Sequence, residues 1–167
     1  MKVIFVWIAL ALLFFGCSNS EPQVKESDNK TINFKGITAR DPGGSPTNTA
    51  DPDDWNFDDK WIEQEISLFG KSLSADCPLP ESLRIMAFPN PATSRLSIYT
   101  TKPDSARIAL RVVDKNFKLL LATDSLYADA VIYDLSKIGV QDTVRVYYKL
   151  ITKSCEYRGH GDIVIKK

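Results

Sequence analysis

Apolar and polar residues alternate with a period of two over most of the second half of the chain. Between residues 143 and 153, the apolar residues Val144, Val146 and Tyr148 alternate with other residues such as Arg145. This alternation is typical of a strand that buries one face and exposes the other. The segment is therefore predicted to have one core face and one mostly solvated face.

Seven short runs of this kind follow one another from residue 83 to the end of the chain. They are rich in β-branched and aromatic residues and are separated by turn residues. The spacing predicts an all-β fold, an immunoglobulin-like antiparallel β-sandwich of about seven strands over residues 77–167. The predicted strands are residues 83–88, 95–101, 106–114, 117–123, 130–135, 143–153 and 161–166.

A helical period precedes these strands. Apolar residues within 58–69 recur at spacings of four and three, which places them on one face of a helix. One short amphipathic helix is therefore predicted within residues 55–75. The defining residues are the apolar face Ile62, Ile66, Phe69 and Leu73, the capping candidates Asp58 and Asp59, and Gly70 at the end.

Two segments before the helix are too polar to form an element of their own. Residues 18–31 contain one isolated apolar residue, and residues 40–54 concentrate Pro, Gly, Ser, Thr and Asp. We expect residues 17–54 to be a flexible tether and linker. A short strand at residues 32–37 is the most that this part can form.

Length and charge limit the possible functions. The chain has 167 residues and a formal net charge of zero, so one domain is expected and neither nucleic acid nor an anionic surface is implied as a partner. The charge is unevenly distributed, because residues 18–83 hold 13 acidic and 6 basic residues, whereas residues 84–167 hold 8 and 14. The two parts attract each other, or both are solvated faces.

The N-terminal segment has the features of a secretory signal. Lys2 supplies the positive charge, residues 3–15 are the apolar region, and Gly16 is the small residue before a cleavage site. The apolar run is shorter than the roughly 20 residues that a membrane-spanning helix needs. Residues 1–16 are therefore expected to be removed. Cleavage nearby and a short uncleaved anchor are the alternatives.

Cys17, directly after Gly16, resembles the lipobox cysteine of bacterial lipoproteins. The resemblance implies a diacylglycerol thioether on Cys17, which palmitate would label, and a mature chain that begins at a lipid anchor. It implies the membrane as a partner and the cell envelope as the location. Ser18 lacks the acidic retention cue of some bacteria, which favours the outer membrane.

The other two cysteines fit an oxidising envelope. If Cys17 carries lipid, Cys77 and Cys155 remain as a pair that can form one disulfide. The bridge would close a loop of 78 residues and stabilise the fold by about 4 kcal/mol. Two buried free thiols are the alternative, because sequence does not show that the sulfurs meet.

A longer motif lies at residues 87–98, AFPNPATSRLSI. It resembles the opening of the C-terminal sorting domain of type IX secretion cargo, with an aromatic residue, Pro-Asn-Pro and a Leu-x-Ile strand. Later segments, VVDKNFK, DLSKIG and DIVIKK, resemble subsequent parts of that family. The resemblance covers about the last 80 residues and implies a role in export or surface attachment. The motif residues are Phe88, Pro89, Asn90, Pro91, Leu96 and Ile98.

The Pro-Asn-Pro run also has a local physical meaning. Pro89 and Pro91 fix φ and withhold backbone donors, and Asn90 tolerates turn geometry. The chain must leave the sheet and re-enter it here. A strand-to-strand corner is therefore predicted.

Residues typical of catalysis are few. His160 is the only histidine and lies between two glycines, so it is predicted to be a surface turn residue at a loop or bulge tip. Neither Cys77 nor Cys155 belongs to a close pair of the kind that binds zinc, and no glycine-rich phosphate loop is found. We expect no enzymatic activity, no cofactor and no metal site.

Two groups near the predicted helix are candidates for binding. The acidic residues could bind Ca²⁺, or form a solvated helix start. The aromatic residues could form an exposed docking surface for a glycan or a partner protein, or pack a helix onto the sandwich. The acidic group is Asp51, Asp53, Asp54, Asp58 and Asp59, and the aromatic group is Trp55, Phe57 and Trp61.

These patterns predict a lipid-anchored, non-catalytic envelope protein that acts as a binding or assembly module. An envelope protein or glycan is the expected partner. A type IX sorting domain and an accessory subunit of an outer-membrane complex are the alternative functions.

Overall fold

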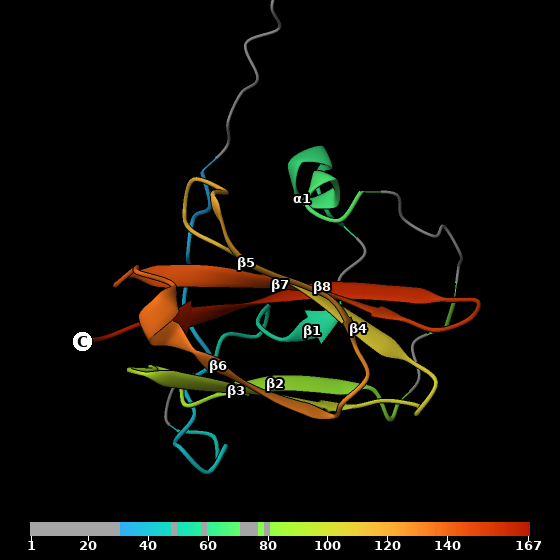
Figure 1. Cartoon of the computed structure of the whole chain (residues 1–167), viewed down its shortest axis with the longest axis horizontal. Coiled ribbons are helices and arrows are strands. Elements are labelled where there is room, and N and C mark those ends of the chain that lie inside the picture. The colour runs from blue at the N-terminus through green and yellow to red at the C-terminus, as the bar shows by residue number, and fades with distance from the viewer. Residues whose placement is uncertain (1–30, 48–49, 58–59, 71–76, 79–80) are drawn as a thin grey trace, which may run out of the picture.

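Two antiparallel sheets face each other in the computed structural model, which describes residues 31–47, 50–57, 60–70, 77–78 and 81–167 (Figure 1). The larger sheet has five strands in the order β1-β8-β7-β4-β5. The smaller sheet has three strands in the order β2-β3-β6. The prediction of a mostly β chain with two antiparallel sheets is confirmed.

Seven of the eight strands overlap the seven predicted runs, and β1 is an additional strand of two residues. The elements are β1 (Asn56–Phe57), α1 (Glu63–Ser67), β2 (Arg84–Phe88), β3 (Arg95–Thr101), β4 (Arg107–Val113), β5 (Leu119–Leu126), β6 (Ala130–Asp134), the 3₁₀ turn η1 (Leu135–Lys137), β7 (Thr143–Ile151) and β8 (Glu156–Val164).

The main hydrophobic core lies between the two sheets. The alternating apolar residues of β7, among them Val144, Val146 and Tyr148, are almost fully buried there, as predicted. Ile108 and Leu110 of β4 are buried in the same core. Burial of this apolar surface is the main favourable contribution to folding.

The opposite face of β7 is also buried, and the prediction of a mostly solvated face is wrong. Tyr147 is 0% exposed and Lys149 is 2% exposed. The reason is that α1 lies over this face of the five-stranded sheet (Figure 1). Ile32 and Trp61 pack with Tyr147 in a second, smaller core. The molecule therefore has three layers.

The helix is shorter than predicted. It begins after Ile62, whose backbone N–H donates to the Glu65 carboxylate at 2.8 Å. Ile66 and Phe69 pack against the second core, as their spacing predicts, whereas Ile62, the residue that caps the start of the helix, is 40% exposed. Gly70, the predicted end of the helix, follows the helix end at Ser67 and has a positive φ of 70°. Asp58, Asp59 and Leu73 lie outside the described residues.

A disulfide joins Cys77 to Cys155, with the two Cα atoms 5.9 Å apart. The predicted pairing is thus confirmed. The bridge connects the chain before β2 to the turn between β7 and β8. Nearby, the Tyr157 hydroxyl donates a hydrogen bond to the Pro78 carbonyl at 3.1 Å.

Strand β8 begins at Glu156, five residues before its predicted start, and includes His160. His160 pairs opposite Tyr147 in the sheet, so the prediction of a turn tip is wrong. The flanking glycines have another purpose. A Cβ atom on Gly161 would lie 2.2 Å from Cε2 of Trp55, and one on Gly159 would lie 1.9 Å from the carbonyl oxygen of Asn56. They leave space for a neighbouring segment.

Replacement of Gly161 by alanine is expected to lower the free energy of unfolding by about 3 kcal/mol, because the added methyl group forces Trp55 out of its packing. Urea denaturation measures this loss. The matched control is Gly43→Ala, where the nearest atom to the added Cβ lies 3.4 Å away. Equal losses in the two variants would show that Trp55 does not need the space.

Candidate functional site

The described part of residues 40–54, which was expected to be a flexible linker, packs against the sandwich. Arg40 and Asn90 exchange two backbone hydrogen bonds, of 3.0 and 2.9 Å. The Asp41 carboxylate accepts N–H groups from the turn that follows it. The ring of Phe88 lies against Gly44. These contacts make the loop part of the folded domain.

The side chain of Asn90 joins three chain segments. Its Nδ2 group donates to the carbonyls of Thr38, at 3.1 Å, and Asp162, at 2.8 Å. Its Oδ1 atom accepts the N–H of Val164 at 3.0 Å. Asn90 is 1% exposed, and a buried amide needs such partners. It lies between β2 and β3, where the corner is predicted, and holds that corner to β8.

The other residues of the sorting-like motif have packing positions. Leu96 and Ile98 are buried in β3 within the main core. Phe88 and Pro89 are half-buried, and Pro91 is exposed.

The buried side chain of Asp54 also joins separate chain segments. One carboxylate oxygen accepts the N–H of Thr38 and the other accepts the N–H of Asp162, both at 2.7 Å. Burial raises the pKa of Asp54 to about 6, although the two backbone hydrogen bonds oppose this shift. The carboxylates of Asp162 and Asp51 add smaller upward contributions to the pKa.

Arg145 and Asp162 form a bidentate ion pair on adjacent strands. Arg145 Nε and Nη2 lie 2.7 Å from the two carboxylate oxygens. Burial lowers the pKa of Arg145, but the hydrogen bond and charge of Asp162 outweigh burial and hold the pKa above its ordinary value. The guanidinium also lies over the ring of Phe34, 5.6 Å from its centroid. The pair is therefore fixed in position on both sides.

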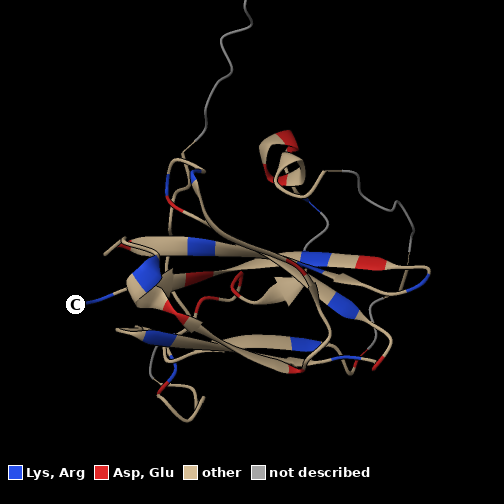
Figure 2. Cartoon of the chain, in the orientation of Figure 1, with Lys and Arg blue, Asp and Glu red and all other residues tan. Residues whose placement is uncertain are grey.

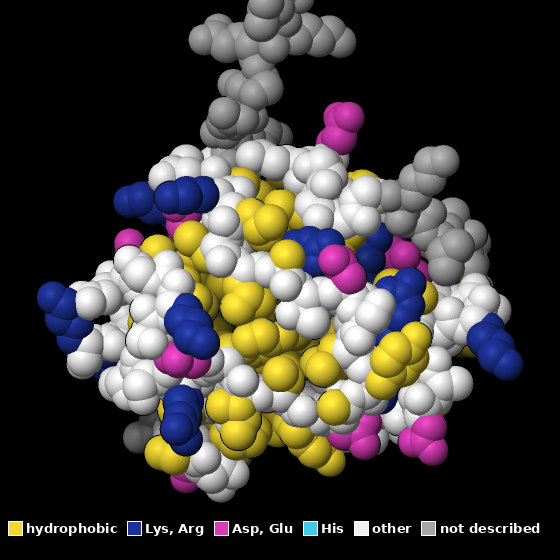
Figure 3. Space-filling model, viewed as in Figure 1, with side chains coloured by type: hydrophobic (Ala, Val, Ile, Leu, Met, Phe, Trp, Pro, Cys, Tyr) yellow, Lys and Arg dark blue, Asp and Glu magenta, His cyan; other side chains and the backbone are white. Residues whose placement is uncertain are grey.

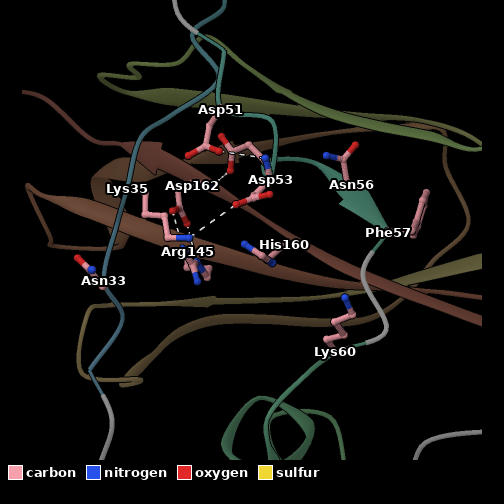
Figure 4. A pocket seen from close by; sticks show the side chains of 11 residues that line it. Asn33, Lys35, Asp51, Asp53, Asn56, Phe57, Lys60, Arg145, His160 and Asp162 are labelled. Atoms are coloured by element: carbon pink, nitrogen blue, oxygen red, sulfur yellow. Dashed lines mark hydrogen bonds and ion pairs between the residues drawn. The ribbon is translucent and has the colours of Figure 1, made fainter.

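An open pocket of about 490 Å³ lies over these groups (Figure 4). Figure 4 shows the side chain of Lys35 reaching toward Asp53. The Lys35 ammonium lies 3.8 Å from the Asp53 carboxylate, and both side chains are mainly exposed. The full lining is Asn33, Lys35, Asp51, Asp53, Asp54, Asn56, Phe57, Lys60, Arg145, His160 and Asp162.

The predicted aromatic docking surface is not exposed. Trp55 is 9% exposed and stacks on Tyr148 in the main core, with ring centroids 5.9 Å apart. Trp61 is 7% exposed and contacts Tyr147 in the second core. The exposed-surface hypothesis is therefore wrong for both tryptophans. Phe57 is half-buried and lines the pocket.

Asp51 and Asp53 of the acidic group are joined by a local hydrogen bond, whereas the Asp54 carboxylate bonds to distant segments. Asp51 Oδ1 accepts the backbone N–H of Asp53 at 2.9 Å. Among the described residues, no group of three or more His, Cys, Asp or Glu side chains is arranged to hold a metal ion. Asp58 and Asp59 lie outside this part of the chain.

A second charged group lies beneath Phe69. Lys149 Nζ is 2.8 Å from Glu156 Oε1, and both side chains are nearly fully buried. The ammonium also lies 5.2 Å from the centroid of the Phe69 ring. A smaller pocket of about 250 Å³ borders this pair. The pair links β7 to β8 beneath Phe69, in the chain that follows α1.

The rest of the surface is described by the distribution of its charged and apolar side chains. Basic and acidic residues occur on both sheets, without separation of the two signs (Figure 2). Apolar side chains gather between the two sheets on the face shown in Figure 3. The edge strands β5 and β6 contribute partly buried apolar residues to the core boundary, including Leu121 and Val131.

In a comparison with known proteins, no protein-family model and no curated protein matches this chain. In the described residues, no helix is both long and apolar enough to cross a membrane. Cys17 lies outside the described residues.

The raised pKa of Asp54 predicts a specific pH dependence. Between its ordinary value of 3.8 and about 6, the folded state binds more protons at this group than the unfolded state. The contribution of Asp54 to stability is therefore fully present below about pH 4 and is lost as the pH rises through 6. The difference in unfolding free energy between wild type and Asp54→Asn is expected to shrink from pH 4 to pH 7.

Urea denaturation at several pH values measures this difference. Asp104→Asn is the control, because Asp104 is exposed; the difference from wild type should stay nearly constant. A difference for Asp54→Asn that is constant or grows with pH would contradict the assignment.

Proposed function

We propose that the protein is a lipid-anchored, non-catalytic module of the bacterial cell envelope that acts by binding a partner at the membrane surface. The observation that carries the proposal is Cys17 directly after Gly16 at the end of an apolar signal. Ile32, near the start of the described chain, donates its N–H to the Lys115 carbonyl at 2.8 Å. The chain from the anchor thus joins the domain at the turn between β4 and β5. We place the anchor in the outer membrane.

We also propose that the fold is immunoglobulin-like. The order β2-β3-β6 corresponds to strands A, B and E of that architecture. The order β8-β7-β4-β5 corresponds to G, F, C and C′. In this interpretation, β1 is an addition that extends the larger sheet beyond β8.

A binding role is supported by the way the buried polar groups are used. Asp54 and the Arg145–Asp162 pair hold chain segments together. The Tyr147 hydroxyl donates to the Glu65 carboxylate at 2.7 Å and joins α1 to the sheet. Such bonds give a rigid support for a binding surface.

A type IX sorting role is the second candidate, supported by the resemblance of residues 87–98. A role as an accessory subunit of an outer-membrane complex is compatible with the same anchor. The proteins with which the chain associates distinguish these roles.

Crosslinking in intact cells tests the proposal when the full chain is compared with Cys17→Ser. The wild-type protein is expected to incorporate radioactive palmitate, to fractionate with membranes and to form one reproducible crosslinked complex. Cys17→Ser should lose all three properties, because the thioether cannot form. Ser18→Ala is the control and should keep them.

Two results would contradict the anchored role: a wild-type band without label, or equal membrane association of Cys17→Ser. The captured partner decides between the functions. Components of type IX export would support sorting, and a stoichiometric outer-membrane complex would support the accessory role.

A further inference from the structure

The pocket beside β1, β7 and β8 has the size of a ligand site. Its volume of about 490 Å³ lies within the roughly 300–1,000 Å³ typical of small-molecule sites. Its lining comes from several separate chain segments, including the one that contains Asn33 and Lys35. The hydrogen bonds of Asp54 and Asn90 hold these segments on the larger sheet.

The charges around the pocket are nearly balanced. Four carboxylates, from Asp51, Asp53, Asp54 and Asp162, line the pocket with three cations, Lys35, Lys60 and Arg145. A strongly anionic ligand would meet the carboxylates, and a strongly cationic ligand would meet the ammonium and guanidinium groups. The electrostatics therefore favour a ligand without a large net charge.

The carboxylate oxygens of Asp54 and Asp162 are already hydrogen-bonded within the protein, so the donors and acceptors open to a ligand are mainly those of exposed lining side chains such as Lys35 and Asp53. The carboxylates only accept, the cations only donate, and the amides of Asn33 and Asn56 do both. Hydroxyl groups match such a mixture because each one donates and accepts. Phe57 adds an apolar surface at one end, against which the C–H face of a sugar ring can pack (Figure 4).

The floor of the pocket is held rigidly, whereas the side chains at its rim can adjust their conformation. Asp162 is 3% exposed and is held by both Arg145 and the corner at Asn90. Lys35 and Asp53 form the rim, with side chains 76% and 69% exposed. A rigid floor reduces the entropy lost on binding, and exposed side chains can adjust to the ligand.

We infer that this pocket binds an uncharged saccharide unit of a cell-envelope glycan. The inference rests on the proposed function, since it names the ligand class and the site of the envelope-binding module.

Saturation-transfer NMR on the full chain in mild detergent tests the inference. The probes are N,N′-diacetylchitobiose, which carries the N-acetylhexosamine rings found in peptidoglycan, and an uncharged oligosaccharide from the outer polysaccharide of lipopolysaccharide. At least one probe should receive saturation from the wild-type protein. The double variant Lys35→Ala, Asp53→Ala should bind about ten-fold more weakly, the loss expected for one or two hydrogen bonds.

The control is the double variant Lys118→Ala, Asp104→Ala. It removes the same two charges from exposed positions outside the pocket lining. It should retain wild-type affinity, and urea denaturation should show that both double variants fold. Absence of binding by both probes, or equal weakening in the two double variants, would overturn the inference.

These outcomes are separable from those of the anchoring experiment. A palmitoylated protein that forms its crosslinked complex but binds neither saccharide would retain the proposed function and reject the saccharide site. A protein that binds saccharide in the pocket but is never acylated would do the reverse.

Discussion

The rest of the structure depends on the hydrogen bonds made by the carboxamide of Asn90. It bonds to the carbonyls of Thr38 and Asp162 and to the N–H of Val164, and Asp54 bonds to Thr38 and Asp162 from the other side. Buried polar groups are costly when a partner is missing. Three segments therefore stabilise one another: the chain that contains Thr38 and Asp54, the corner after β2 that contains Asn90, and strand β8. Each supplies hydrogen-bond partners that the other two need.

This junction also connects the fold to the proposed activity. With the loop held by Asp54, Trp55 enters the core over Gly161, and the chain continues directly into β1 beside β8. The pocket then forms where the loop, β1 and the Arg145–Asp162 pair meet. The pocket is thus a consequence of the way in which the N-terminal segment is packed, and Trp55 and Trp61, the tryptophans of the predicted docking surface, are buried in the two cores instead of lining it.

Local patterns predicted the sheets but not the site. A period of two is a property of each strand alone, so β2 to β8 and the core face of β7 could be found from sequence, and cysteine counting found the disulfide. The role of the glycines around His160 could not be predicted, because Trp55 and Asn56, which need the space at Gly161 and Gly159, are more than 100 residues away. The acidic and aromatic groups singled out near the predicted helix include four residues of the pocket lining, Asp51, Asp53, Asp54 and Phe57. Their distant partners Lys35, Arg145 and Asp162 could not be found from sequence, since they converge with this group only when the separate segments pack.

Native-state hydrogen exchange tests the central claim most directly. If the polar junction is integral to the fold, the amide protons of Thr38, Asp162 and Val164 will exchange with the same free energy as the slowest amides of β7, because they open only when the whole domain unfolds. Rapid exchange at Thr38, Asp162 and Val164 while β7 stays protected would show that the N-terminal loop is a separate attachment and would contradict the account.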